Sequence, residues 1–433
     1  MNVNRESHHI LETFGVTHRR IYHIKTSETK IETQEENLQY QSLTSLFLNA
    51  FLPHGYPESV SSDYLQYQIW DSLQAFASSI TGSICTHAVL KGVGVGDENA
   101  SAIAATITWL LKDGVSMIGR IGFAWLQGTK LDSDCKKWRL FADALNDIAM
   151  FLDLVTAYFQ NHFMFIICIS GLMKSIVGVA GGCTRAALTQ HQARKNNMAD
   201  VSAKDGSQET LVNLVALMCS LVILPVVTKN MVLTWIVYVA MTSIHLIANY
   251  LAIKSVVMEI FNESRFEIYT THYFNEGLKK RKFLTVSEVN QKENLFPANF
   301  IQNVQIKAGS SFTNIIHKRR CEEVEKFLKI YDTCDYLLRV SRITSSKTVI
   351  YITFSPKCTT LTYIEAFYQA CFVKHLLEHP HFPAVDKESE THLEVASREY
   401  TSKTFKDFTQ SLEAMKFNTN AVAFNIDSWQ AEW

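Results

Sequence analysis

Two long segments without charge follow one another near the middle of the chain. Thr210–Thr228 and Asn230–Ile253 contain no Asp, Glu, Lys or Arg, and Lys229 is the single charged residue between them. A helix needs about 20 apolar residues to cross the hydrocarbon core of a bilayer. Because soluble domains rarely carry two such segments in succession, we expect this part of the chain to lie in a membrane.

Composition and motifs exclude several classes of function. The 433 residues carry a formal net charge of −1, which gives no electrostatic attraction for nucleic acid. None of the nine cysteines forms a Cys-x-x-Cys pair, so we expect a reducing compartment rather than a disulfide scaffold or a zinc ribbon. No catalytic motif, metal-ligand spacing or cofactor signature is visible, and we expect neither an enzyme nor a metal or cofactor protein.

The distribution of apolar residues predicts a mainly α fold in three parts. Residues 1–42 are polar and predict a mobile arm, and no apolar secretory signal is visible there. Residues 43–262 predict a polytopic helical membrane bundle, and residues 263–433 have the composition of a soluble α+β domain. A wholly soluble helical bundle is the alternative for the middle part, because buried core helices can be very apolar.

Within the bundle, the pattern predicts helices separated by two conspicuous polar stretches. The first is the Gly-rich segment 91–97, and the second is a long loop from Gln190 to Glu209, with Ser207 capping a helix that begins at Glu209. Pro225, Lys229 and Asn230 predict a turn between the two charge-free runs. The helices expected before these runs are 72–90, 100–126, 132–158 and 155–184.

A short internal similarity raises the hypothesis of a duplicated three-helix unit. Cys85-Thr-His-Ala-Val-Leu90 resembles Cys183-Thr-Arg-Ala-Ala-Leu188, and each hexapeptide closes an apolar helix. The two units would span 64–158 and 162–262. An odd number of helices in each unit would give the copies opposite membrane orientations, as in inverted-repeat transporters. Coincidence between two helix ends rich in small residues is the alternative.

The last third alternates between strand and helix patterns. The β-α-β-β-α-(α)-β order predicts a small ferredoxin-like domain. The strands are expected over 301–307, 335–341, 348–354 and 421–426, and the helices over 319–329, 360–377 and 389–415.

The two polar stretches of the bundle contain the candidate ligand-binding residues. The Gly-rich segment lacks the dinucleotide spacing and follows a helix rather than a strand, so we reject a nucleotide site. It is either a helix end with a basic last turn or a backbone that approaches a ligand. The second stretch is either a solvated loop or a site for phosphate or carboxylate. The candidates are Lys91, Gly92, Gly94, Gly96, Asp97, Arg185, Arg194, Asn196, Asn197 and Asp200.

Charged residues inside predicted helices form a second group of candidates. Asp143 and Asp147 share one helical face with Arg139, which predicts an i,i+4 ion pair or, alternatively, acid–base or cation-binding groups. If their helix spans the membrane, Lys112, Asp113 and Arg120 would need a partner or a water-filled cavity, as an intramembrane ion pair or as proton carriers. If it lies in the interface, they are ordinary surface charges. Six glycines predict close helix contacts, namely Gly114, Gly119, Gly122, Gly171, Gly178 and Gly181.

Several long motifs occur in order along the chain. They are Phe51–Val60, Tyr64–Gln74, Ala88–Asp97, Trp138–Asp147, Thr184–Gln190 and Arg194–Glu209. Together they resemble the root UV-B-sensitive (RUS) family. The resemblance covers roughly residues 45–290 and extends more loosely into the last third, where Ser287-Glu-Val-Asn290 matches.

The resemblance implies a eukaryotic membrane protein, and we expect an animal-type member. Because the chain shows no plastid transit sequence, we do not expect the organelle of the plant members to carry over. Animal members of the family are described as membrane proteins of unknown activity. Plant members are linked to root UV-B responses, vitamin B6 homeostasis and auxin transport, and act partly as complexes with one another. The family supplies no established catalytic residue to carry over to this chain.

These observations lead to two main functional hypotheses. The first is transport or sensing of a small anionic metabolite, linked to vitamin B6 homeostasis, at helix ends and basic loops. The second is a non-catalytic membrane scaffold that acts through protein partners. An enzyme acting on a vitamin B6 vitamer is a third and weaker hypothesis. The expected partners are membrane lipid and a second copy or a family relative; the sequence does not name the membrane.

Overall fold

The computed structural model of the chain describes residues 7–14, 18–25, 32–36, 48–95, 101–277, 281–296, 303–344, 347–378 and 390–433. The chain divides into two compact units. The first comprises Met1–Trp125 and Trp138–Val256, and the second comprises Leu126–Lys137 and Val257–Trp433. The second unit is therefore discontinuous in sequence.

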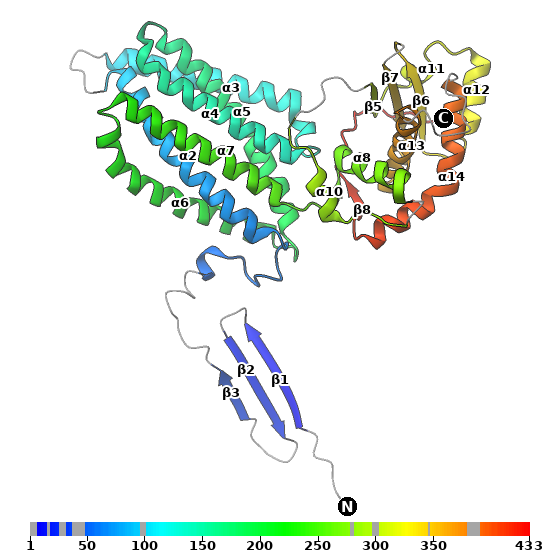
Figure 1. Ribbon diagram of the computed structural model, residues 1–433, viewed down its shortest axis with the longest axis horizontal. Helices are drawn as coiled ribbons and strands as arrows, with labels where there is room; N and C mark the ends of the chain where they lie inside the picture. Colours follow the sequence, from blue (N-terminus) through cyan, green and yellow to red (C-terminus); the bar gives the residue numbers. More distant parts are fainter. Residues whose placement is uncertain are drawn as a thin grey trace, which may run out of the picture. The chain divides into compact units, whose positions relative to one another are not determined.

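Six long helices running side by side form most of the first unit (Figure 1). They are α2 (Tyr64–Val93), α3 (Ala102–Gln127), α4 (Cys135–Val155), α5 (Phe163–Gln192), α6 (Met198–Val227) and α7 (Met231–Ser255). Short 3₁₀ turns follow α3 and α4, at Gly128–Lys130, Thr156–Tyr158 and Gln160–His162. The expected turn near Pro225 is confirmed, because α6 ends at Val227 and the Asn230 side chain caps α7 by accepting from the Val232 and Leu233 amides.

The interior of this bundle is built around α2, which packs against both α6 and α7. Ile80, Ile84 and Cys85 of α2 form a buried apolar cluster with Met150 of α4 and Tyr238 of α7. Small residues bring α3 and α5 close together: a Cβ on Gly119 would lie 2.0 Å from Leu172 Cδ1. The contacts predicted for Gly119 and Gly171 are thus present, whereas a Cβ on Gly114, Gly122 or Gly181 would meet nothing within 4 Å.

Within the described residues, three helices are long and apolar enough to cross a membrane: Gln160–Gln192, Met198–Val227 and Met231–Ser255. Only 17% of the most apolar window of Met198–Val227, and the same share of that of Met231–Ser255, is buried inside the protein. The outer faces of these helices therefore expose large apolar side chains, such as Leu221, Val222 and Val226 of α6 and Val232 and Ile236 of α7.

The N-terminal segment expected to be a mobile arm contains regular structure. Strands β1 (Ser7–Phe14), β2 (His18–Lys25) and β3 (Glu32–Glu36) pair in order as an antiparallel sheet. The polarity of this segment suggested an arm, but the segment also contains β-branched and aromatic residues that suit strands, such as Ile10, Phe14, Ile21 and Tyr22.

The second unit combines a small mixed sheet with helices. The three-stranded sheet contains β5 (Val304–Ala308), β6 (Tyr336–Arg342) and β7 (Thr348–Phe354) in the order β5-β7-β6, and β4 (Ile260–Phe261) pairs separately with β8 (Asn418–Val422). The remaining elements are α8 (Glu263–His272), a π-helical turn (Tyr273–Gly277), α10 (Val286–Lys292), α11 (Phe312–Ile316), α12 (Cys321–Ile330), α13 (Thr360–Glu378) and α14 (Glu390–Ala414).

The expected ferredoxin-like arrangement is matched in three strands only. β5 is parallel to β7, and β6 is antiparallel to β7, as the first three strands of that fold require. The fourth strand, β8, joins β4 in a parallel pair instead of extending the sheet, and the chain after β8 makes single bridges at Ala308 and Phe354. A complete ferredoxin-like sandwich is therefore not confirmed. The core is aromatic, with Phe266, Tyr269, Phe367 and Phe408 buried together.

Two expectations about the bundle have different outcomes. The six helices fall into two sets of three over the ranges proposed for the repeat, but equal helix numbers do not establish a duplication, which stays a hypothesis. The prediction of a long loop over 190–209 is wrong. Helix α5 runs to Gln192, and α6 begins at Met198, directly after Asn197. Ser207 therefore lies inside α6 and does not cap a helix. The residues are polar but include no helix breaker other than Gly206, and polarity alone does not prevent a helix.

Candidate functional site

A polar cavity of about 410 Å³ lies among α2, α4, α5 and α6 in the first unit. Its volume is in the range of small-molecule sites. Three acidic and two basic side chains line it, together with neutral polar groups and two glycines. The lining residues are Tyr67, Asp71, Gln74, Ala75, Ser78, Ser79, Arg139, Gly181, Gly182, Arg185, Asp205, Glu209 and Asn213.

One basic group of the cavity is Arg139 of α4. Its Nη2 lies 3.2 Å from Asp71 Oδ1 on α2, and its Nε lies 3.5 Å from Asp143 Oδ2 one turn along α4. The Tyr67 hydroxyl donates to the same Asp71 oxygen over 3.3 Å. The i,i+4 ion pair expected between Arg139 and Asp143 is present, and Asp71 is the second carboxylate that the sequence analysis did not identify.

The other basic group is Arg185 of α5, which contacts two carboxylates of α6. Its Nε donates to Asp205 Oδ2 over 2.6 Å, and its Nη1 donates to Glu209 Oε2 over 2.7 Å. Asp205 and Glu209 are one turn apart, so both face Arg185. Gln68 of α2 donates to the other Asp205 oxygen over 3.1 Å, which ties α2, α5 and α6 together at this point.

A buried histidine extends the polar network into α7. His245 Nδ1 lies 2.8 Å from Asp147 Oδ2, and Gln74 Nε2 lies 3.3 Å from His245 Nε2. Gln74 lines the cavity, so these contacts connect it to Asp147. Two buried oxygens of this region have no hydrogen bond within the part of the chain that the structure describes: Gln74 Oε1 and Asp147 Oδ1. Such atoms mark a place where water or a ligand can bind.

The charges define what the cavity can hold. Guanidinium groups bind carboxylates and phosphates through paired hydrogen bonds, and carboxylates accept hydrogen bonds from cationic or neutral donors. Two arginines and three carboxylates therefore suit a small molecule that carries both a negative group and a donor or positive group. With all five ionised, the lining has one more negative than positive charge, so a ligand that is purely anionic would need a proton to accompany it.

The structure separates the residues expected to bind a ligand. Arg185 lines the cavity, whereas Lys91, Gly92 and Gly94 lie at the end of α2. Gly94 has a φ of 93° and its amide donates to the carbonyls of Leu90 and Lys91, which is a helix C-terminus as the simpler interpretation expected. Gly96 and Asp97 lie outside the described residues.

The remaining candidates lie at the turn between α5 and α6 or in the first turn of α6, and two of them contact the segment before α2. The Asp200 carboxylate accepts from the His54 amide over 2.7 Å, and the Arg194 amide donates to the Ser59 carbonyl over 3.1 Å. Asn197 Oδ1 accepts from the Lys195 amide, and Asn196 has a φ of 53° in the turn. Two of the sequence motifs, Phe51–Val60 and Arg194–Glu209, are thus brought together by backbone contacts.

The three charges of α3 do not form an ion pair within the described part of the chain. Lys112 Nζ lies 4.2 Å from the centre of the Trp109 ring, and Asp113 and Arg120 are exposed. Asp143 and Asp147, by contrast, belong to the polar network of the cavity.

The acidic and imidazole groups missed by sequence reasoning had a visible signal. Asp71 is the only acidic residue of α2 and His245 is the only histidine of α7, and an ionisable group in a membrane helix marks a function or a partner. Asp205 and Glu209 were noted as polar but were placed in a loop.

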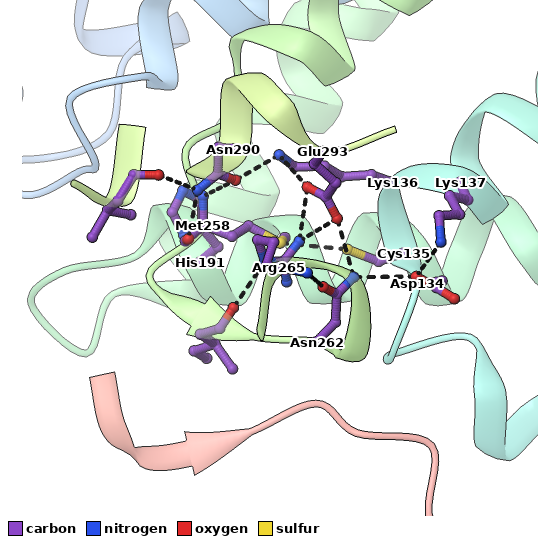
Figure 2. Close-up of polar contacts among 12 residues, drawn as sticks. Asp134, Cys135, Lys136, Lys137, His191, Met258, Asn262, Arg265, Asn290 and Glu293 are labelled. Atoms are coloured by element: carbon purple, nitrogen blue, oxygen red, sulfur yellow. Dashed lines mark hydrogen bonds and ion pairs between the residues drawn. The ribbon is translucent and has the colours of Figure 1, made fainter. Parts of the chain in front are cut away.

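A second polar cluster is fully buried in the other unit (Figure 2). Glu293 lies between Arg265 Nη1, 2.8 Å away, and Lys136 Nζ, 3.2 Å away, and all three side chains are at most 3% exposed. The two cations, which outweigh the cost of burial, lower the pKa of Glu293 to about 2, whereas burial lowers the pKa of Lys136.

Asn290 completes this cluster. Its Oδ1 accepts from Lys136 Nζ over 2.7 Å and from the Met258 amide over 3.0 Å, and its Nδ2 donates to the Met258 carbonyl over 2.9 Å. Thr285 and Glu288 form a capping box that starts the helix carrying Asn290. The Ser287–Asn290 motif therefore has a structural role: it joins α10 to Lys136 and to the segment before β4.

The chain was compared with known proteins. Residues 37–277 match the family described as the vitamin B6 photo-protection and homoeostasis domain, and residues 282–433 match the root UVB sensitive protein C-terminal family. RUS family member 1 of Dictyostelium discoideum is 45% identical over 289 residues, covering 66% of this chain and 53% of the relative. No solved structure matches the chain.

Plant relatives extend the comparison. Protein root UVB sensitive 3 of Arabidopsis thaliana is 36% identical over 272 residues, covering 63% of this chain and 61% of the relative. Protein root UVB sensitive 5 of the same plant is 26% identical over 428 residues, covering 91% of this chain and 79% of the relative. The chain thus spans between half and two thirds of the length of the first two relatives. The two domain matches together show that the chain belongs to the root UVB sensitive family.

Proposed function

We propose that the chain is a membrane protein whose α2–α7 bundle binds a small polar metabolite in the cavity between Arg139 and Arg185, for transport or for sensing. The observation that carries this proposal is the cavity itself: five ionisable side chains from four helices converge on about 410 Å³, beside an apolar cluster of the same bundle. Ionisable groups inside a membrane domain cost several kcal/mol each unless they serve a ligand, a proton path or one another.

The exposed faces of the bundle support a lipid environment. The outward side chains of α6 and α7 are aliphatic over most of the two spans. In water such a continuous apolar surface would promote aggregation, whereas in a bilayer it costs nothing. Two cavity groups, Asp71 and Arg139, have side chains only 18% and 14% exposed and pair with one another, and membrane proteins place ionisable groups where they have such partners.

The mixture of charges favours a metabolite that carries opposite charges, such as one of the vitamin B6 class. The matching domain is described by vitamin B6 homoeostasis. A vitamer of this class carries a ring nitrogen that can be protonated and a phenolic oxygen that can be ionised, so it presents opposite charges on one small ring. Arg139 or Arg185 would contact the anionic side, and Asp71, Asp205 or Glu209 the protonated side. No covalent step is part of the proposal.

Uptake into liposomes that contain the purified full chain tests the proposal. Ser78→Leu narrows the cavity without changing a charge, and Arg185→Gln removes one guanidinium; both are expected to lower uptake of labelled pyridoxine or pyridoxal at least ten-fold. Arg194→Gln is the matched control, because Arg194 is exposed at the α5–α6 turn outside the cavity.

The outcomes separate three cases. Uptake that depends on Ser78 and Arg185 supports transport. Saturable binding without uptake, lost in the same variants, supports sensing. If Arg194→Gln abolishes binding while Ser78→Leu does not, the cavity is not the site, and the basic turn between α5 and α6 is favoured instead.

A scaffold function is the second candidate, favoured by α3. One face of this helix exposes Ile103, Leu110, Ile118, Ile121 and Trp125, the last 84% exposed, although α3 is not among the three candidate spans. We propose that such a face would bind a helix of a second copy or of a family relative. Replacing Ile118 and Ile121 by Asn would then dissociate the complex in native electrophoresis without changing metabolite binding.

A further inference from the structure

The C-terminal unit contains a second cavity, and its lining is basic. It has a volume of about 460 Å³ and is formed by the connection between α11 and α12, by α12, by β6 and by the start of α14. Six lining side chains are basic: His317, Lys318, Arg319, Lys326, Arg339 and Arg342. This sign is opposite to that of the cavity in the helical unit, so the two sites would take different ligands.

The acidic groups near this cavity already accept hydrogen bonds from other groups of the chain. Glu323 accepts from the Arg320 amide over 3.1 Å in the capping box of α12, and Glu390 accepts from the Arg342 amide over 2.7 Å. Glu394, which is buried behind the lining, contacts Arg319 Nη2 at 2.5 and 2.6 Å. Five Lys or Arg side chains therefore face three carboxylates, which leaves an excess of two positive charges.

Arg339 is the most confined of the basic groups, with 5% of its surface exposed. Its Nη1 donates to the carbonyls of Asn314 at 2.6 Å and Ile315 at 3.3 Å, and these neutral acceptors fix the guanidinium without balancing its charge. Its Nε is buried and has no hydrogen bond within the described residues. Burial, followed by the nearby charge of Arg319, lowers the pKa of Arg339, so its surroundings disfavour its positive charge. An anion bound in the cavity would favour the positive charge of Arg339.

The chemistry of the lining selects the class of anion. Guanidinium and ammonium groups that converge on one concave site bind phosphate or carboxylate. A phosphate monoester carries close to two negative charges at neutral pH, since its second pKa is about 6. That charge matches the excess of two positive charges, whereas a single carboxylate would balance half of it.

We propose that this cavity is a binding site for a phosphate monoester dianion, with Arg339 as the fixed contact and Lys318 and Lys326 as contacts at its rim. In the described part of the chain neither lysine forms an ion pair, and both are exposed, so they are available to a ligand. The phosphate can belong to a soluble metabolite or to a lipid headgroup. The site does not depend on the cavity of the helical unit.

Binding of inorganic phosphate to the full chain in mild detergent tests the site. Equilibrium dialysis with labelled phosphate should show saturable binding near pH 7.5, weakened about three- to ten-fold by Lys318→Gln and by Lys326→Gln, because each loses one charge-assisted hydrogen bond. Lys329→Gln is the matched control for Lys326→Gln, because both lysines lie on α12. Lys329 is 73% exposed, pairs with Glu325 and lies outside the cavity lining. It should leave the affinity unchanged.

A second measurement identifies the source of the phosphate. The amines of Lys318 and Lys326 are labelled with acetic anhydride in phosphatidylcholine nanodiscs, with added phosphate or with phosphatidylinositol 4-phosphate in the bilayer. Protection by free phosphate alone assigns a soluble ligand, and protection by the lipid assigns a headgroup. Absence of saturable binding and of protection in both arms, or binding that Lys329→Gln weakens as much as Lys326→Gln, overturns the proposal.

Discussion

The buried cluster around Glu293 makes a quantitative prediction about charge. Lys136 and Arg265 carry two positive charges, and Glu293 carries the single negative charge between them. Glu293→Gln would leave two positive charges in a site from which water is excluded. Breaking a buried ion pair by removing one partner costs about 3–5 kcal/mol. Lys136→Met, in contrast, leaves the neutral pair of Arg265 and Glu293 and should cost about 1 kcal/mol, mainly for its lost hydrogen bonds.

Hydrogen exchange of the full chain measures both costs. Amides of α8 and α10 that open with the cluster should exchange about 150- to 5,000-fold faster in Glu293→Gln and about five-fold faster in Lys136→Met, since 1.36 kcal/mol corresponds to a factor of ten. Glu325→Gln is the control for loss of a carboxylate, because Glu325 is 72% exposed. Equal effects of Glu293→Gln and Lys136→Met would refute the argument, which rests on the sign of the charge that remains.

Three further predictions concern pH and glycine positions. The pKa of Glu293 is about 2 in the folded protein and 4.5 in the unfolded chain, so the ionised carboxylate stabilises the folded state fully above pH 4.5, and this stabilisation is lost as the pH falls towards 2. In denaturant titrations, the difference in unfolding free energy between wild type and Glu293→Gln should therefore shrink between pH 4.5 and 2 and stay constant from pH 5 to 7. Gly309→Ala should destabilise the C-terminal unit by several kcal/mol, seen as a lower midpoint of thermal unfolding, because φ is +69° there and an added Cβ would lie 1.9 Å from the Asp427 carbonyl oxygen. Gly119→Ala should weaken the packing of α3 against α5, since its Cβ would lie 2.0 Å from Leu172 Cδ1. Gly122→Ala places its Cβ in open space and should be neutral or stabilise the protein by up to about 1 kcal/mol. Similar melting temperatures for the two variants would contradict the close contact at Gly119.

The sequence was sufficient for elements whose pattern is local. The charge-free runs correspond to α6 and α7, and the strand pattern over 348–354 coincides with β7. It was insufficient where polarity was taken for absence of structure. The N-terminal strands were missed for this reason, and so was the first part of α6, which has helix-compatible polar residues.

The candidate site was predicted in part, because its contacts are distant in sequence. Arg185 was selected from its polar neighbourhood, and the Arg139–Asp143 pair from helical spacing. The partners Gln68 and Asp205 are 137 residues apart, and Gln74 and His245 are 171 apart. Such pairings are fixed by how the helices pack, which no local pattern encodes. The basic cavity of the C-terminal unit was missed for the same reason, since its residues come from four separate elements.

The discontinuity of the second unit also affects how the protein is made. Lys136 leaves the ribosome long before Glu293, its partner in the buried cluster, and 154 residues before Asn290, which accepts its hydrogen bond. The nascent chain must therefore keep residues 126–137 accessible until most of the remaining polypeptide has been translated. A fragment that starts at Val257 lacks the Lys136 ammonium group. Separate expression of the C-terminal half therefore requires residues 126–137 as a fused or added peptide.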